Sequence, residues 1–110
     1  MEASICGVDH LALQCYDVAR SHDFYTRVLG GALISADAAY GAAWGHAYML
    51  FGYRLPDGTS MALFAVDGIE TPPEPGAMDD INHIALIAGS AQAIEAWKAR
   101  LPATASRSRR

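Results

Sequence analysis

Charge, cysteine and long apolar runs are all scarce in this chain of 110 residues. Charged residues make up 18% of the sequence and hydrophobic residues 52%, which indicates either a well-filled core or an apolar surface reserved for a ligand or partner. No apolar run reaches the roughly 18 residues of a membrane-spanning helix, so we expect no membrane association. Because the N-terminus lacks the basic start and apolar stretch of a signal peptide, we expect a cytoplasmic protein.

Basic residues are scarce over most of the chain. The net charge is −4, and five of the eight Lys and Arg residues lie between Lys98 and Arg110, which leaves the preceding part strongly acidic. A protein that binds nucleic acid needs a basic face, so we expect no nucleic-acid partner.

The sequence contains only two cysteines, Cys6 and Cys15. They are nine residues apart on what reads as one strand, and an odd spacing places them on opposite faces. We therefore expect two reduced structural thiols and no disulfide.

An internal repeat is the most informative feature that is present. Residues 8–13 (Val-Asp-His-Leu-Ala-Leu) return as residues 81–86 (Ile-Asn-His-Ile-Ala-Leu), and the similarity continues to residues 28 and 101. Such a repeat indicates one strand-plus-helix unit used twice, with the apolar faces of the two copies buried against each other. It places His10 and His83 at equivalent points of two strands. Two imidazoles related in this way are the start of a metal site.

Hydrophobic periodicity and turn residues predict five strands and two helices. Asp17 and Ser90 are the expected N-caps of the helices, Gly30-Gly31 ends the first helix, and Pro102 ends the second. A Pro-Asp-Gly turn at 56–58 joins two of the strands in a hairpin. The expected strands are 5–16, 32–39, 46–55, 60–67 and 80–88, and the expected helices are 18–29 and 91–101.

This order predicts an α+β fold within one domain, in which a βαβββ module is followed by an incomplete βα module. The first module covers residues 5–70, a proline-rich linker 71–78, the partial second module 79–101, and a disordered basic tail 102–110. The first copy uses about 40 residues after its helix for three strands, whereas the second has nine residues left. We therefore expect the second module to be cut short.

The sequence resembles the vicinal oxygen chelate superfamily, the group of glyoxalases, bleomycin-resistance proteins and extradiol dioxygenases. The resemblance rests on residues 8–13, on the helix opening Asp17-x-x-Arg20-Ser21-x-x-Phe24-Tyr25, and on residues 81–86. It extends from residue 5 to about residue 101. It implies paired βαβββ modules whose sheets curl around a cleft that holds a metal, and it is specific for the superfamily rather than for one activity within it.

The resemblance also implies a set of metal ligands. His10 and His83 match the two histidine ligands, while the glutamate of the eighth strand has no counterpart in this sequence. The glyoxalase branch often adds a glutamate on the fourth strand, but residues 60–67 hold only Asp67, at the end. Two histidines and one carboxylate form the facial pattern of non-haem Fe(II) oxygenases, so Fe²⁺ is the first expectation, with Mn²⁺, Ni²⁺ or Zn²⁺ as alternatives. Without the repeat, each histidine alone would more readily be explained as a polar residue of a half-buried strand.

Two further residues are candidates for catalysis. His46 begins the third strand and could act in acid/base chemistry if that strand lines the cleft, although a strand-end histidine needs no such role. Tyr53 is a second candidate, and core packing is the simpler explanation for an aromatic strand residue. His22 is explained by a solvated helix face.

Three functions are compatible with these observations. The first is a divalent-metal-dependent enzyme, a ring-cleaving dioxygenase or a lyase, that acts on a small molecule with neighbouring oxygens. The second is a metal-free, resistance-type protein that binds a small molecule, against which the presence of both histidines argues. The third is a non-catalytic remnant with exposed sheet edges. The incomplete second module and the resemblance both favour a homodimer.

Overall fold

The computed structural model describes residues 3–43, 45–72 and 84–108. The chain forms two compact units, Met1–Glu70 and Thr71–Arg110.

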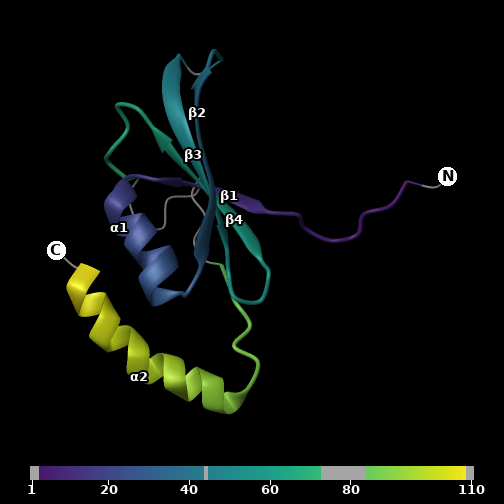
Figure 1. Ribbon diagram of the computed structural model, residues 1–110, viewed down its shortest axis with the longest axis vertical. Coiled ribbons are helices and arrows are strands. Elements are labelled where there is room, and N and C mark those ends of the chain that lie inside the picture. Colours follow the sequence, from purple (N-terminus) through teal and green to yellow (C-terminus); the bar gives the residue numbers. More distant parts are fainter. Residues whose placement is uncertain (1–2, 44, 73–83, 109–110) are drawn as a thin grey trace. The chain divides into compact units, whose positions relative to one another are not determined.

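The first unit contains one sheet of four strands in the order β1-β4-β3-β2. β1 runs parallel to β4, while β3 is antiparallel to both β4 and β2 (Figure 1). A parallel pair needs a crossover connection, and here the chain from β1 to β4 passes through the helix and two strands. This is the predicted βαβββ order and an α+β fold. The strands are β1 (Leu11–Cys15), β2 (Ala32–Gly41), β3 (His46–Arg54) and β4 (Ser60–Val66).

The first strand is shorter than the predicted 5–16. Its residues pair in parallel with β4 from Leu11 opposite Met61 to Cys15 opposite Ala65. β4 begins at Ser60, so the residues before Leu11 have only the hairpin turn beside them and find no strand to pair with. Cys6 therefore precedes the strand, and the argument from strand spacing does not apply to it, although both cysteines are free as expected.

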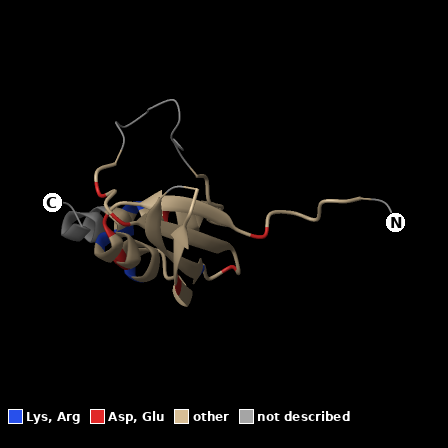
Figure 2. Cartoon of the chain, turned by 90° about the horizontal axis from the view of Figure 1, so that it is seen from above, with Lys and Arg blue, Asp and Glu red and all other residues tan. Residues whose placement is uncertain are grey.

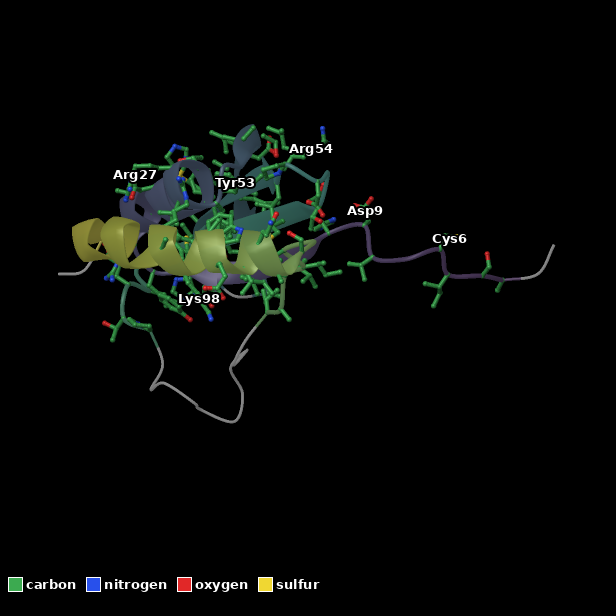
Figure 3. All side chains as sticks on the ribbon, turned by 90° about the horizontal axis from the view of Figure 1, so that it is seen from below. Cys6, Asp9, Arg27, Tyr53, Arg54 and Lys98 are labelled. Carbon is green, nitrogen blue, oxygen red and sulfur yellow. The ribbon has the colours of Figure 1, made fainter. Side chains whose placement is uncertain are left out.

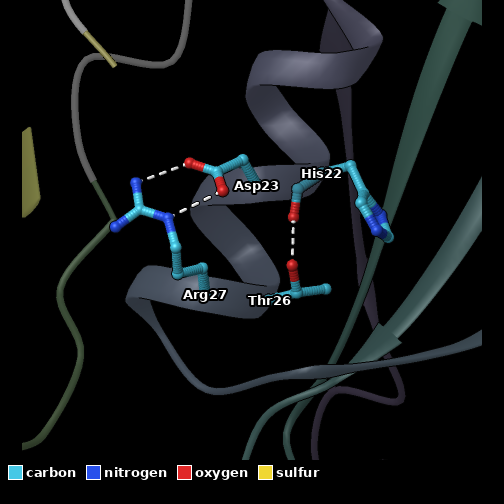
Figure 4. Close-up of polar contacts among 4 residues, drawn as sticks. All are labelled: His22, Asp23, Thr26 and Arg27. Atoms are coloured by element: carbon cyan, nitrogen blue, oxygen red, sulfur yellow. Dashed lines mark hydrogen bonds and ion pairs between the residues drawn. The ribbon is translucent and has the colours of Figure 1, made fainter. Parts of the chain in front are cut away.

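The helical segment begins and ends where the sequence predicts. The side chain of Asp17 accepts a hydrogen bond from the backbone N–H of Arg20 and so caps α1 (Val18–Asp23). The segment continues as a single π-helical turn, η1 (Phe24–Val28), and ends before Gly30, whose φ of 78° suits glycine. Across the junction Asp23 and Arg27 form a two-pronged ion pair with N···O distances of 2.8 and 2.6 Å (Figure 4).

The core of the first unit lies between this helical segment and one face of the sheet. Its centre is Cys15, Tyr53 and Leu63, each less than 9% exposed, from three adjacent strands. Tyr25 of η1 packs against this cluster, with its ring stacked on that of Tyr53 at 5.8 Å between centroids. The strands themselves carry almost no charge, with Asp37 and Arg54 as their only Asp, Glu, Lys or Arg side chains (Figure 2). Burial of this uncharged face stabilises the sheet against the helix.

The second unit contains one described helix, α2 (Ala91–Ser108). Its N-cap is as predicted, because the Ser90 hydroxyl accepts a hydrogen bond from the N–H of Ala93. One expectation is corrected. The predicted stop at Pro102 is replaced by helix up to Ser108, so proline has removed one backbone donor without ending the helix. The predicted strand 80–88 falls partly outside the described residues, and its described part, 84–88, has no strand pairing.

Candidate functional site

The first predicted metal ligand, His10, lies immediately before β1. Its side chain is 53% exposed, and its Nδ1 lies 2.8 Å from the Oδ2 of Asp9. Figure 3 shows Asp9 on the extended N-terminal segment that leads into the strand. The ring of His10 is therefore accessible and is held through one nitrogen by a neighbouring carboxylate.

This contact with Asp9 has a consequence for metal binding. When Nδ1–H of His10 donates to the Asp9 carboxylate, the neutral imidazole keeps the lone pair of its Nε2. A histidine ligand in a metal site is commonly oriented in this way, with the other ring nitrogen donating to a carboxylate. The local arrangement of Asp9 and His10 thus fits an imidazole that binds a cation through Nε2.

The second predicted ligand, His83, lies outside the described residues, so the metal-ligand pair stays a prediction. Within residues 3–43, 45–72 and 84–108, no three His, Cys, Asp or Glu side chains come together as a metal site. The described residues include His10 but not His83. The expected metal site of two histidines and a carboxylate therefore lies outside what these residues alone can form.

The candidate base His46 lies at the other end of the sheet from His10. It begins β3, and its Nδ1 lies 3.1 Å from the backbone oxygen of Asp67, just after the carboxyl end of β4. Because β1 and β4 are parallel, His10 is next to the amino end of β4 instead. The five residues of β1 span about 16 Å, so the first unit does not bring the two histidines together.

The candidate Tyr53 is buried beneath the helix. Only 1% of the residue is exposed, and its hydroxyl lies 2.8 Å from Nδ1 of His22. Burial raises the pKa of the Tyr53 hydroxyl above its ordinary value of 10.0, with a smaller contribution from Cys15. His22 is exposed on the helix, as the sequence predicts, and its Nδ1 also forms a hydrogen bond with the buried Tyr53, which the sequence did not reveal.

The sequence did not reveal a pocket at the carboxyl ends of β1 and β4. Its volume is about 590 Å³, and all of its lining residues belong to the first unit. The lining is mainly apolar, with two tyrosines, one thiol and three carboxylates. It consists of Cys15, Tyr16, Asp17, Val18, Ala47, Tyr48, Met49, Ala65, Val66, Asp67, Gly68, Ile69 and Glu70. The only sequence signal for it is the spacing of acidic residues just after strand ends.

Comparison with protein families defines the class to which this fold belongs. Residues 7–106 match the model of the Glyoxalase/Bleomycin resistance protein/Dioxygenase superfamily, so the chain belongs to that family. The resemblance predicted from the strand histidines and the helix opening is thereby confirmed. A comparison with curated protein sequences finds no match.

Solved structures show the same fold. The chain is similar to a glyoxylase/bleomycin resistance protein/dioxygenase domain from Frankia sp. EAN1pec, with a TM-score of 0.75 and 22% identity over 93% of this chain and 71% of that one. It is also similar to the fosfomycin resistance protein FosX of Listeria monocytogenes, with a TM-score of 0.63 and 14% identity over 93% of this chain and 74% of FosX. At such identities the likeness establishes the fold alone.

Among the described residues, no helix is both long and apolar enough to cross a membrane.

Proposed function

We propose that this chain belongs to a divalent-metal-dependent enzyme that acts on a small molecule with two neighbouring oxygens. In this proposal His10 and His83 hold the ion together with a carboxylate as the third ligand. The contact that carries the proposal is the one between Asp9 and His10, because it prepares Nε2 of an exposed imidazole as a ligand. Bound there, a divalent ion supplies Lewis-acid polarisation of the substrate oxygens or a place for dioxygen beside them.

The ion and the small molecule bound in one structural neighbour support this choice of metal ion and substrate class. The E126Q mutant of FosX was crystallised with Mn(II) and 1S,2S-dihydroxypropylphosphonic acid, which carries two adjacent hydroxyl groups. A substrate with vicinal oxygens can chelate an ion through both oxygens, which explains why an open coordination sphere is useful. We take Fe²⁺ as the first candidate ion and Mn²⁺ as the second.

The remaining residues of the first unit have positioning roles in this proposal. Asp9 fixes the tautomer of His10 and orients its ring. His10 directly precedes β1, so the pairing of β1 with β4 fixes its position. β4 begins at Ser60, one residue before Met61, which pairs with Leu11. We also propose a homodimer, because β1 and β2 are the edge strands of the sheet and each has one unpaired side there within the described unit.

Metal titration tests the proposal. Mn(II) binding to the full chain is measured by electron paramagnetic resonance, for the wild type and for His10→Ala, His83→Ala and His46→Ala. Loss of either proposed ligand is expected to weaken binding by at least about tenfold, whereas His46→Ala, a matched histidine change at the far end of the sheet, leaves it unchanged. Equal affinities in all four proteins would refute the assignment of the ligands.

A metal-free binding function makes a different prediction in the same experiment. A small molecule that shifts the melting temperature equally in the presence and absence of a chelator would favour the resistance-type alternative over the enzyme.

A further inference from the structure

The pocket lies at the end of the sheet face that the helical segment covers. Register aligns Cys15, Ala65 and Met49 in one row across β1, β4 and β3. The preceding row, which includes Leu63 at 3% exposure, is covered by Tyr25 and the rest of the core. The final row is covered unevenly, because Cys15 at one end is 6% exposed and Met49 at the other end is 44% exposed. The Met49 end of this row is therefore the accessible part of the apolar floor of the pocket.

Acidic side chains surround this apolar floor. Asp17 lines the pocket on the helix side, and Asp67 and Glu70 line it from the segment that follows β4. None of the lining residues is Lys or Arg. The pKa of the Cys15 thiol, which also lines the pocket, is raised above its ordinary value mainly by burial.

From this combination we propose that the pocket binds a small organic ammonium ion with an apolar body. Met49 and Ala65 of this row accept the apolar part, while Tyr16 offers an aromatic ring to the cation. The carboxylates at the rim supply the opposite charge. A volume of about 590 Å³ lies within the range of small-molecule sites.

Other ligand classes fit the pocket less well. An anion would meet three carboxylates with no basic side chain in the lining. A bare metal ion would need several ligands converging on one point, and the described residues contain no such group of three. An ammonium ion with an apolar body uses both the charge and the floor, so it is the occupant that the lining favours.

This site is independent of the proposed metal site. It lies at the carboxyl end of β1, whereas His10 precedes the amino end. The floor residue Cys15 belongs to the core-facing row, and His10 is not among the residues that line the pocket. Binding of the cation is therefore expected to persist in excess chelator and in His10→Ala. Failure of one proposal leaves the other intact.

The experiment uses benzyltrimethylammonium as the probe, titrated into the full-length chain in the presence of a chelator. Binding is followed by amide chemical shifts in a ¹H–¹⁵N NMR spectrum. We expect saturable shifts at Ala47, Gly68 and Ile69, and much weaker responses to phenylacetate, an anion of similar size, and to benzyl alcohol, a neutral one.

Two double variants separate a specific site from general charge attraction. Asp67→Asn with Glu70→Gln removes two exposed carboxylates from the pocket and is expected to weaken binding about tenfold. Asp37→Asn with Glu95→Gln removes the same charge elsewhere and is expected to leave affinity unchanged. Circular dichroism checks that both variants are folded, and Glu70→Gln alone provides a milder change, with an intermediate loss expected.

Three results would overturn the proposal. One is the absence of saturable shifts at the pocket residues. Another is equal weakening by the two double variants, which would reduce the effect to net charge. The third is binding of phenylacetate as tight as that of the cation.

Discussion

The hydroxyl of Tyr53 on β3 lies 2.8 Å from Nδ1 of His22 on α1, and this part-buried contact joins the helix to the sheet. Tyr53 is almost fully buried, so its hydroxyl would lose hydration on folding without a partner. His22 supplies that partner, and the ring of Tyr25 stacks on the ring of Tyr53. A tyrosine and a histidine with no obvious sequence relationship therefore form one structural unit.

Replacement of Tyr53 by Phe tests the energetic role of this contact. The variant keeps the buried ring but removes the hydroxyl and leaves His22 without its core partner. We expect the free energy of unfolding to fall by about 1 kcal/mol in urea denaturation. Tyr40→Phe, a matched change at a residue that is 64% exposed, is expected to have no measurable effect. Equal stability of the two variants would show that the contact contributes nothing.

A close approach of the backbone at Gly31 leads to a second prediction. A Cβ atom built there would lie 2.7 Å from the backbone oxygen of Tyr25 and 3.3 Å from that of Arg54. Backbone atoms cannot move aside as flexible side chains do, so Gly31→Ala is expected to cost about 1–3 kcal/mol of stability. Ala36→Ser, on the exposed β2, serves as the control and is expected to be nearly neutral. A Gly31→Ala protein that melts at the same temperature as the wild type would contradict this close approach.

The elements of the first unit could be predicted because their signals are local. Asp17 and Gly30 bound the helical segment, and a Pro-Asp-Gly turn lies between two apolar runs, so periodicity and capping residues were sufficient. The true start of β1 could not be read in the same way. It depends on where β4 begins, and β4 is about fifty residues away along the chain. Strand length is therefore a property of the pair rather than of either segment.

The candidate site shows the same limit more clearly. The residue types of His10, His46 and Tyr53 make them candidates for a functional site. Which of these residues lie close together depends on the topology of the sheet. The parallel pairing of β1 with β4 separates His10 from His46, and side-chain alternation places Tyr53 on the face beneath the helix. The bond between His22 and Tyr53 was missed for the same reason, since it requires the packing of α1 on β3. The composition of the sequence predicts neither the strand pairing nor the packing of the helix on the sheet.

The two cysteines are expected to differ in reactivity. Cys6 is exposed, whereas Cys15 is only 6% exposed and burial raises the pKa of its thiol above the ordinary value of 9.0. Because the thiolate is the reactive form, a chromogenic disulfide reagent at about pH 8 should react with one thiol quickly in the native protein and with both in urea. Cys6→Ser should remove the fast phase and Cys15→Ser should keep it. Rapid reaction of both thiols in native buffer would contradict the burial of Cys15.

The turn before β4 leads to a prediction about pH. The hydroxyl and backbone N–H of Thr59 donate to the carboxylate of Asp57 at 2.7 and 3.0 Å, and these bonds lower the pKa of Asp57 below its ordinary value of 3.8. A lowered carboxyl pKa stabilises the fold above the unfolded-state pKa, and this contribution is lost as the pH falls through the folded-state pKa. Thr59→Ala should raise the pKa of Asp57 in an NMR titration, whereas Thr26→Ala should not alter it. An unchanged pKa in Thr59→Ala would assign the shift to another cause.

The last prediction concerns Asp9 and rests on the proposed metal site. If Asp9 fixes the tautomer of His10, then Asp9→Ala should weaken Mn(II) binding while leaving both proposed histidine ligands in place. Asp9 is 97% exposed, so water can replace part of its role. We therefore expect the affinity for Mn(II) to fall by about threefold to tenfold, which is at the low end for residues that hydrogen-bond to a metal ligand. Asp9→Asn retains an acceptor oxygen and should lose less.

Asp37→Ala is the control for Asp9→Ala, because it removes the same charge from an exposed position on β2 that the proposal does not use. Binding in this variant should match the wild type. If Asp9→Ala and Asp37→Ala weaken Mn(II) binding equally, then Asp9 contributes only net charge and does not orient His10. If neither variant has an effect while His10→Ala abolishes binding, then the imidazole binds the ion without help from the carboxylate beside it.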